Sequence, residues 1–242
     1  MCGRFVSVSP PDEVARYFGA DGSTEVVLEP SYNVAPTDDV YVVYQSGDAR
    51  RLDTFHWGLV PFWAKDPSVG NRMINARAEG LAAKGAYRNA FAKQRCLIPA
   101  DGFYEWQRVP GRKQKQPYFV HRSDDEPMAF AGLWERWRGP GGPDRSLRSC
   151  TIVTTKANET MEPIHDRMPV VLPPAVWDEW LDPDGHDTAA LEQLLVPAPP
   201  RIIAVHPVST AVGNVANNGA ELLEPVDPAL ADDGGLFSSS PP

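Results

Sequence analysis

Apolar residues occur in short runs, many of them β-branched or aromatic, and polar, Pro-rich or Gly-rich segments separate these runs. Residues 150–155 form an apolar, β-branched run typical of a buried strand. Residues 40–44 and 52–57 flank a polar turn, as the two strands of a hairpin do. The same pattern predicts further strands, which we expect at residues 96–99, 102–107, 127–137 and 201–205, with a charged hairpin tip at 111–116.

Helix signals are few. Ser9, two prolines and two acidic residues come before an apolar stretch, which predicts a helix over residues 12–18 that ends at Gly19. Residues 79–95 have a helix-forming composition that Gly85 interrupts. Shorter helices are expected at residues 173–181 and 188–195.

Many short strands, few helices and 25 prolines predict an α+β fold. We expect a single domain over residues 2–226, with a curved, mainly antiparallel β-sheet or barrel core and a few short peripheral helices. Residues 58–75 combine Pro, Gly and aromatic residues without a clear period, which indicates a long functional loop. Residues 227–242 are small, acidic and rich in Pro and Ser, which predicts a disordered C-terminal tail.

The net charge of −9 argues against a generally basic nucleic-acid-binding protein, but the charge is unevenly distributed. Residues 50–122 hold 14 Lys and Arg against 5 Asp and Glu, a net charge of +9. Such a segment inside an acidic chain is typical of a localised anion site, although its charges could also point in all directions. No apolar run has the length of a membrane span, and three separated cysteines indicate reduced thiols. We therefore expect a cytoplasmic monomer.

Cys2 has a chemical property that no internal cysteine has. If Met1 is removed, Cys2 carries a free α-amine and a thiol on adjacent carbons. The amine of such a 1,2-aminothiol condenses with an aldehyde to a Schiff base, and the thiol then closes a five-membered thiazolidine ring. The first residues therefore indicate a possible aldehyde trap, although many proteins lose Met1 without consequence.

An aldehyde-trapping cysteine needs groups that orient it and move protons, and three polar residues lie in apolar surroundings. They are Asn75, Glu105 between Tyr104 and Trp106, and His165 in a loop bracketed by prolines. An inward-facing Glu105 would suit proton transfer, whereas an outward-facing one would be an ordinary surface residue. His165 would suit proton transfer near neutral pH, or could be a structural loop histidine.

The loop after Trp57 combines aromatic residues with arginines, as single-strand nucleic-acid binding sites do. We assign Trp57 to the core and expect Trp63 to be the exposed stacking residue. Arg72 and Arg77 follow this loop and could contact phosphates.

Eight segments, in order between residue 2 and about residue 226, resemble the SOS-response-associated peptidase (SRAP) family. They are Cys2-Gly3-Arg4-Phe5, Tyr32-Asn33-Val34-Ala35-Pro36-Thr37, Trp57-Gly58-Leu59-Val60-Pro61, Asn75-Ala76-Arg77-Ala78-Glu79, the stretch from Arg95 to Trp106, Ala131-Gly132-Leu133-Trp134, His165-Asp166-Arg167-Met168-Pro169, and Val212-Gly213-Asn214-Val215.

The resemblance implies a protein that removes Met1 autocatalytically and senses abasic sites in single-stranded DNA and at single-strand/double-strand junctions. It implies a reversible thiazolidine crosslink between Cys2 and the aldehyde of the ring-opened sugar. Such a crosslink would shield the lesion during the DNA damage (SOS) response, with the protein associated with the nucleoid when bound to damaged DNA. No cofactor and no metal are implied.

The resemblance also implies roles for individual residues. Cys2 would be the nucleophile, Asn75 would orient it, and Glu105 and His165 would transfer protons. The DNA-binding residues would be Arg4, Arg77 and Arg167 at phosphates and Trp63 as a stacking wedge.

Two other functions remain open from the sequence. The first is a cysteine peptidase or amidohydrolase that acts in trans, with Cys2 as nucleophile, His165 as base and Asn75 in an oxyanion hole. The second is a single-strand DNA-binding protein without chemistry, for which Cys2 would be dispensable.

Overall fold

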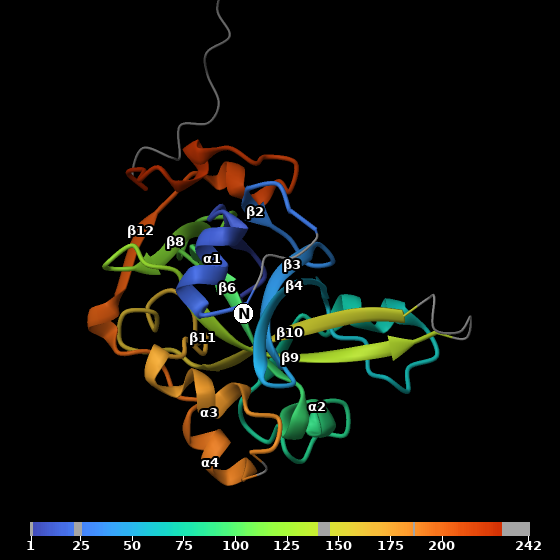
Figure 1. The fold of residues 1–242 in the computed structure, drawn as a ribbon. Coiled ribbons are helices and arrows are strands. Elements are labelled where there is room, and N and C mark those ends of the chain that lie inside the picture. Colours follow the sequence, from blue (N-terminus) through green and yellow to red (C-terminus); the bar gives the residue numbers. More distant parts are fainter. Residues whose placement is uncertain (1, 22–25, 140–145, 186, 229–242) are drawn as a thin grey trace, which may run out of the picture.

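The computed structural model describes residues 2–21, 26–139, 146–185 and 187–228 of the chain, which form two β-sheets with short helices at their edges (Figure 1). The larger sheet contains a closed barrel, since each of five strands pairs with two others around a ring. In ring order these strands are β10 (Ser146–Lys156), β4 (Ala49–Trp57), β3 (Asp39–Ser46), β6 (Arg95–Ala100) and β9 (Met128–Arg138).

Two short strands extend the barrel at β10. β5 (Asn75–Arg77) pairs with β10 in parallel, and β11 (Arg167–Pro169) pairs with it antiparallel. The β10–β4 pair is also parallel, and the other pairs of this sheet are antiparallel. β10 therefore brings β5 and β11, which are 90 residues apart in the sequence, to one part of the barrel.

The second sheet packs against the barrel and carries the N-terminal segment. Its strand order is β12 (Ile203–Pro207), β8 (Gln116–Arg122), β7 (Gly102–Gln107), β1 (Phe5–Ser7) and β2 (Ser31–Val34), with every pair antiparallel. β7 follows β6 after one residue, so that the two sheets are joined directly.

Aromatic and β-branched side chains fill the barrel, as the strand alternation predicts. Phe55, Trp57, Phe130 and Ile152 are fully buried in one cluster that also contains Cys2. Gly132 lies where a Cβ atom would come within 2.8 Å of the Cys96 sulfur, so the interior has no room for a side chain at this position.

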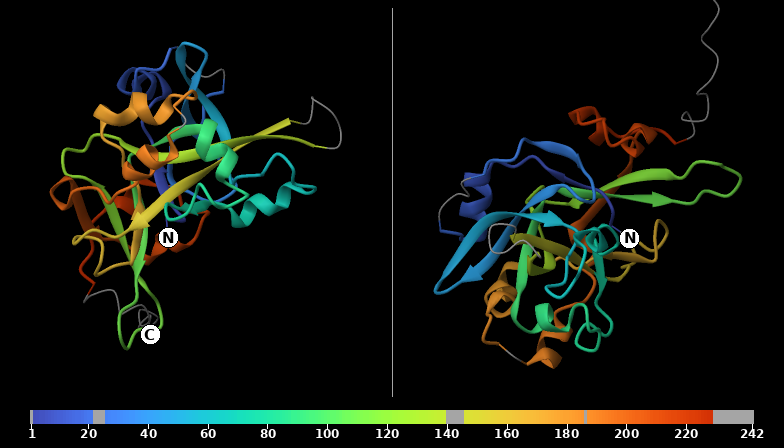
Figure 2. Two further views of the ribbon diagram at one scale, coloured as in Figure 1. Left: turned by 90° about the horizontal axis from the view of Figure 1, so that it is seen from below. Right: turned by 90° about the vertical axis from the view of Figure 1, so that its right-hand side faces the viewer.

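Helices cover the outside of the sheets (Figure 2). α1 (Pro11–Phe18) begins after Pro10 and ends at Gly19, which has a φ of +62°. The remaining helices are α2 (Arg88–Lys93), α3 (Trp177–Leu181), α4 (Thr188–Gln193) and the 3-10 turns η1 (Pro67–Arg72), η3 (Pro174–Val176), η4 (Pro200–Ile202), η5 (Thr210–Gly213) and η6 (Ala220–Leu223).

The structure confirms the predicted α+β class, the barrel and the main strands. The expected helix over residues 79–95 is wrong, because only Arg88–Lys93 is helical and turns precede it. Gly80 has a φ of +76°, which an α-helix does not allow, while Ala78 and Leu81 are buried in the core. Tertiary contacts thus override helix propensity in this segment. The predicted tail lies outside the described residues apart from residues 227 and 228.

Candidate functional site

Cys2 lies immediately before β1 and is fully buried. It belongs to the apolar cluster of the barrel and contacts the protein rather than solvent. Burial raises the pKa of its thiol well above the usual value, and the negative charge of Glu105 raises it further, while the positive N-terminus acts in the opposite direction. The Cys2 sulfur makes one long contact of 3.9 Å with the Arg4 carbonyl oxygen. At neutral pH the thiol therefore keeps its proton.

Asn75 holds the backbone of Cys2. Its side-chain amide donates a hydrogen bond of 2.7 Å to the Cys2 carbonyl oxygen. Strand β5 fixes this geometry, because Asn75 pairs with Ile152 on β10 and the indole of Trp57 donates to the carbonyl of Ile74 at 3.0 Å. Asn75 Oδ1 is buried and has no hydrogen-bond partner among the described residues. The amide thus contacts Cys2 and retains one acceptor for a further donor.

Glu105 faces inward and is 4% exposed, which answers the question that the sequence left open. It lies on β7, whose Phe103 pairs with Phe5 on β1, so the strand pairing places Glu105 beside the residues that precede Phe5. One carboxylate oxygen accepts a hydrogen bond of 3.2 Å from the Trp106 amide. The carboxylate therefore lies close enough to Cys2 to influence its thiol electrostatically.

His165 lies between β10 and β11, with a side chain that is 25% exposed. Its Nδ1 accepts a hydrogen bond of 3.0 Å from the Arg167 amide and is 2.9 Å from an Asp166 carboxylate oxygen. The first contact requires an Nδ1 without a proton, and the second requires a proton on Nδ1. The Gln107 side chain donates to Pro163 at 2.9 Å and thereby attaches this loop to the strand that carries Glu105.

Arg4 and Arg167 are engaged within the protein. Arg4 donates to Asn33 at 2.7 Å and to the Val212 carbonyl at 2.9 Å. Arg167 forms a bidentate pair with Glu79, with distances of 2.7 and 2.9 Å. Neither guanidinium is therefore directed freely to solvent.

Arg77 is exposed and lines a cavity of about 770 Å³ with Lys156, Asn158 and Arg167. Neither Cys2 nor Glu105 lines this cavity. The carboxylates of Glu159, Glu162 and Asp166 line the same cavity, so its opening has mixed charge. Trp63 is 58% exposed and Trp57 is fully buried, as the sequence predicted.

Asn33 is a structural residue of the site that was not expected from the sequence. Asn33 is 4% exposed, accepts from Arg4, and donates to the carbonyls of Asn214 and Asn217 at 3.0 and 2.8 Å. It thus joins β1, β2 and the segment after η5, which are the positions of three of the recognised motifs. The position of Asn33 inside one of these motifs was the signal that could have indicated its role. Glu79, the partner of Arg167, was also missed, although it lies in a motif.

No cluster of three or more potential metal-ligating side chains occurs in the described part of the chain. Within that same part, the helices are too short or too polar to span a membrane.

The barrel and the second sheet together enclose Cys2, whose carbonyl oxygen is held by Asn75 and whose thiol is influenced by the charge of Glu105. The model of the family "SOS response associated peptidase (SRAP)" matches residues 1–215, and the chain belongs to this family.

Curated relatives include the abasic site processing protein YoqW of Bacillus subtilis, which is 44% identical over 93% of this chain and 99% of its own length. The abasic site processing protein YedK of Escherichia coli is 33% identical over 93% and 100%. The abasic site processing protein HMCES of Xenopus tropicalis is 30% identical over 92% and 78%.

Solved structures share the fold. A protein from Bacteroides thetaiotaomicron superposes with a TM-score of 0.82 at 23% identity, covering 93% of this chain and 100% of the other. A phage-related protein from Bordetella bronchiseptica superposes with a TM-score of 0.67 at 31% identity, covering 86% and 94%.

Proposed function

We propose that this protein processes abasic sites in DNA as part of the DNA damage response, through a covalent reaction of Cys2. The observation that carries the proposal is the environment of Cys2, which is buried, held by Asn75 at 2.7 Å and faced by the charge of Glu105. Family membership and the names of the relatives support the same activity.

The reaction begins with removal of Met1, which frees the α-amine of Cys2. The amine attacks the aldehyde of the ring-opened abasic sugar, and loss of one water molecule gives a Schiff base. The Cys2 sulfur then forms a bond to the same carbon, and the thiol proton is transferred to the nitrogen. No atom changes its oxidation state when the thiazolidine forms, so the reaction needs neither a redox partner nor a redox cofactor.

The raised pKa of the Cys2 thiol determines the order of these steps. A thiol that keeps its proton is a weak nucleophile, so the amine reacts first and the sulfur attacks while it loses its proton. Glu105 takes this proton from the sulfur and passes it to the nitrogen, and reversal of the crosslink moves the proton back along the same path.

His165 transfers protons to and from the sugar oxygen, since its Nδ1 lies within hydrogen-bond distance of a donor, the Arg167 amide, and of an acceptor, an Asp166 carboxylate oxygen. Arg77 holds a phosphate of the DNA, and Trp63 stacks beside the lesion. Arg167 reaches a phosphate by exchanging Glu79 for it. Arg4 acts through the fold, since its hydrogen bonds with Asn33 and Val212 hold β1.

The proposed substrate is single-stranded DNA or a single-strand/double-strand junction, bound by a monomer that associates with the nucleoid. A peptidase that acts in trans is the alternative function, and the burial of the Cys2 sulfur does not separate the two, because a peptide and a DNA aldehyde would both have to reach it. The Met1–Cys2 peptide bond is part of the chain itself, so its cleavage does not require a separate peptide to enter the site.

The test is a denaturing gel after incubation with single-stranded DNA that carries one abasic site. We expect a shifted band that survives heating in detergent without any reductant. Cys2→Ala keeps the α-amine, so it should give a shifted band only when borohydride reduces the Schiff base. A stable band with Cys2→Ala and no reductant would contradict the thiazolidine. Mass spectrometry of the wild-type protein should show that Met1 is absent, since its presence would leave no amine on Cys2.

A further inference from the structure

A second cavity lies on the arm formed by the outer parts of β9 and β10, which projects from the barrel (Figures 1 and 2). Its volume is about 450 Å³. Aromatic, amide, carboxyl and guanidinium groups line it. They belong to Phe62, Trp134, Asn89, Gln94, Glu135, Arg136 and Arg138. None of these residues belongs to the site at Cys2.

The arginines at this cavity differ from five arginines that are engaged within the protein, although Arg136 also donates a long hydrogen bond of 3.4 Å to Ser146 Oγ. Arg4, Arg50, Arg122, Arg148 and Arg167 each bind a carboxylate or a backbone carbonyl. Arg136 and Arg138 are exposed, and no described carboxylate forms an ion pair with either of them. Two guanidiniums without such partners are available for phosphate groups.

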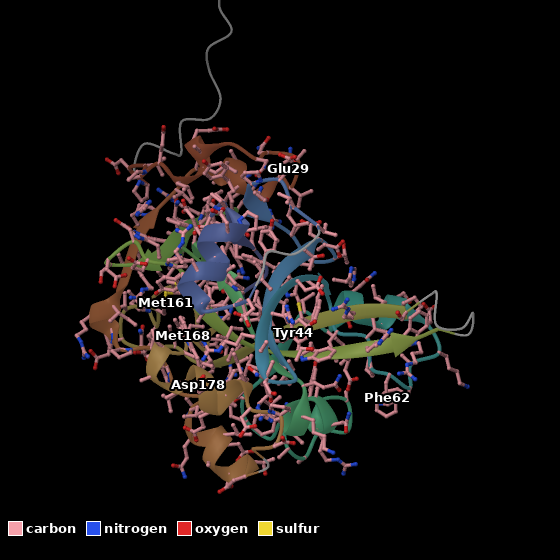
Figure 3. The ribbon with its side chains drawn as sticks, in the orientation of Figure 1. Glu29, Tyr44, Phe62, Met161, Met168 and Asp178 are labelled. Atoms are coloured by element: carbon pink, nitrogen blue, oxygen red, sulfur yellow. The ribbon has the colours of Figure 1, made fainter. Side chains whose placement is uncertain are left out.

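The cavity also has an aromatic side and a polar side. Phe62 is 56% exposed although it is a large apolar residue, and it lies below the arm in Figure 3. Trp134 lines the same cavity from β9. The Asn89 amide donates a long hydrogen bond of 3.4 Å to the Gln94 side-chain oxygen and also hydrogen bonds to Glu135, so a base would have to exchange for one of these contacts. Aromatic faces stack on bases of any sequence, and amides hydrogen bond to the exposed edge of an unpaired base.

The position of the cavity relative to Cys2 follows from the pairing of β10. Ile152 pairs with Asn75, which holds Cys2, and Ser146 pairs with Arg138. Six residues of extended strand span about 20 Å. A DNA strand that leaves the abasic site along β10 would thus meet the cavity after a few nucleotides.

We propose that this cavity binds one unpaired nucleotide of the strand that flanks the abasic site, with its base against Phe62 and Trp134 and its phosphates at Arg136 and Arg138. The proposal rests on the proposed function for its substrate and adds a second contact with that substrate. Phe62 and Trp63, the two aromatic residues of the loop after Trp57, would then contact different parts of the DNA. Phe62 would contact the flanking base, and Trp63 would stack beside the lesion.

The test uses binding of undamaged single-stranded DNA, measured by fluorescence anisotropy at several salt concentrations, and crosslinking of abasic DNA of two lengths. The variants are Arg136→Ala, Arg138→Ala, the double variant and Phe62→Ala. Arg16→Ala is the matched control, because Arg16 is an exposed arginine on α1. All five changes are on the surface and should leave the melting temperature unchanged.

We expect the double variant to bind a 15-nucleotide strand roughly three- to tenfold more weakly near 0.1 M salt. The slope of log K against log salt should fall by about 0.7 for each lost phosphate contact. Phe62→Ala should weaken binding roughly fivefold or more, with little change in that slope. A 2-aminopurine base placed a few nucleotides from the abasic site should lose fluorescence when wild-type protein binds, and should regain it with Phe62→Ala.

Crosslinking separates this proposal from the previous one. The double variant should crosslink a three-nucleotide abasic strand as fast as the wild type, and a long abasic strand more slowly at limiting protein. The proposal is overturned if the double variant binds the 15-nucleotide strand no more weakly than Arg16→Ala does. The two proposals can also fail separately. If neither the wild type nor any variant crosslinks DNA, the chemistry at Cys2 is refuted. If the double variant still binds the 15-nucleotide strand more weakly in that case, the nucleotide site is supported.

Discussion

Replacing Glu135 by Gln should remove a pH dependence from the stability of the protein. Glu135 lies on β9 and is 3% exposed. Burial raises the pKa of its carboxyl group to about 7, although hydrogen bonds from the Asn89 side chain and the Arg136 backbone partly offset the effect. The residue is therefore a carboxylic acid that titrates within the range of ordinary buffers.

The sign of the effect follows from proton binding. The pKa of Glu135 is higher in the folded chain than its ordinary value of 4.5, so the folded chain retains a proton that the unfolded chain has lost. The free energy of unfolding then falls as the pH rises from about 4.5 to about 7, and it levels off above that range. Each pH unit in this interval corresponds to about 1.4 kcal/mol, which gives a loss of roughly 3 kcal/mol by pH 8.

Urea unfolding at pH 5, 6, 7 and 8 measures this loss in the wild type and in Glu135→Gln. Glutamine retains the shape and the neutral charge of the protonated acid, so the two proteins should have similar stability at pH 5. At pH 8 the variant should be the more stable protein by up to about 3 kcal/mol. Glu13→Gln, at an exposed position on α1, is the control for loss of one surface charge. If the stability curves of wild type and Glu135→Gln stay parallel from pH 5 to pH 8, the reasoning is refuted.

Three further substitutions test other contacts. Glu79→Gln removes the bidentate partner of Arg167, so single-stranded DNA should bind about two- to fivefold more tightly in anisotropy, with a steeper salt dependence. Gly58→Ala brings a Cβ atom within 2.7 Å of the Gly70 carbonyl oxygen at a φ of +145°, and should cost about 2 kcal/mol or more in urea unfolding. Asn33→Ala should cost about 2 kcal/mol and speed up hydrogen exchange after η5, whereas an unchanged exchange rate would contradict its structural role.

The barrel strands could be predicted because their signals are local. The run around Cys150 is rich in β-branched residues and is buried at every position from 149 to 155, and the hairpin of β3 and β4 has a polar turn at the expected place. The burial of Trp57 and the exposure of Trp63 followed from the same reasoning. Elements of this kind depend on their own residues more than on distant ones.

Other features depend on contacts between distant segments and could not be found in this way. Strand β5 has three residues and exists because β10 lies beside it, so its sequence alone gives no strand signal. The inward orientation of Glu105 depends on β1, which pairs with β7 from almost 100 residues earlier. Arg4 was expected at a phosphate, and its engagement with Asn33 and Val212 requires three segments that only the folded chain brings together.

In the proposed reaction, the burial of Cys2 means that several groups have to act together with the thiol. An exposed cysteine with a low pKa would react with many electrophiles, whereas the raised pKa of a buried thiol would keep Cys2 unreactive until an aldehyde is bound beside Glu105. Glu105 has two opposing effects, because its charge disfavours the thiolate in the resting protein and its oxygens can take the proton during ring closure. Glu105→Gln should therefore lower the pKa of the Cys2 thiol and yet slow the crosslink. A thiol titration and a crosslinking time course on one protein sample would show both changes, and a faster crosslink would mean that the carboxylate acts only through its charge.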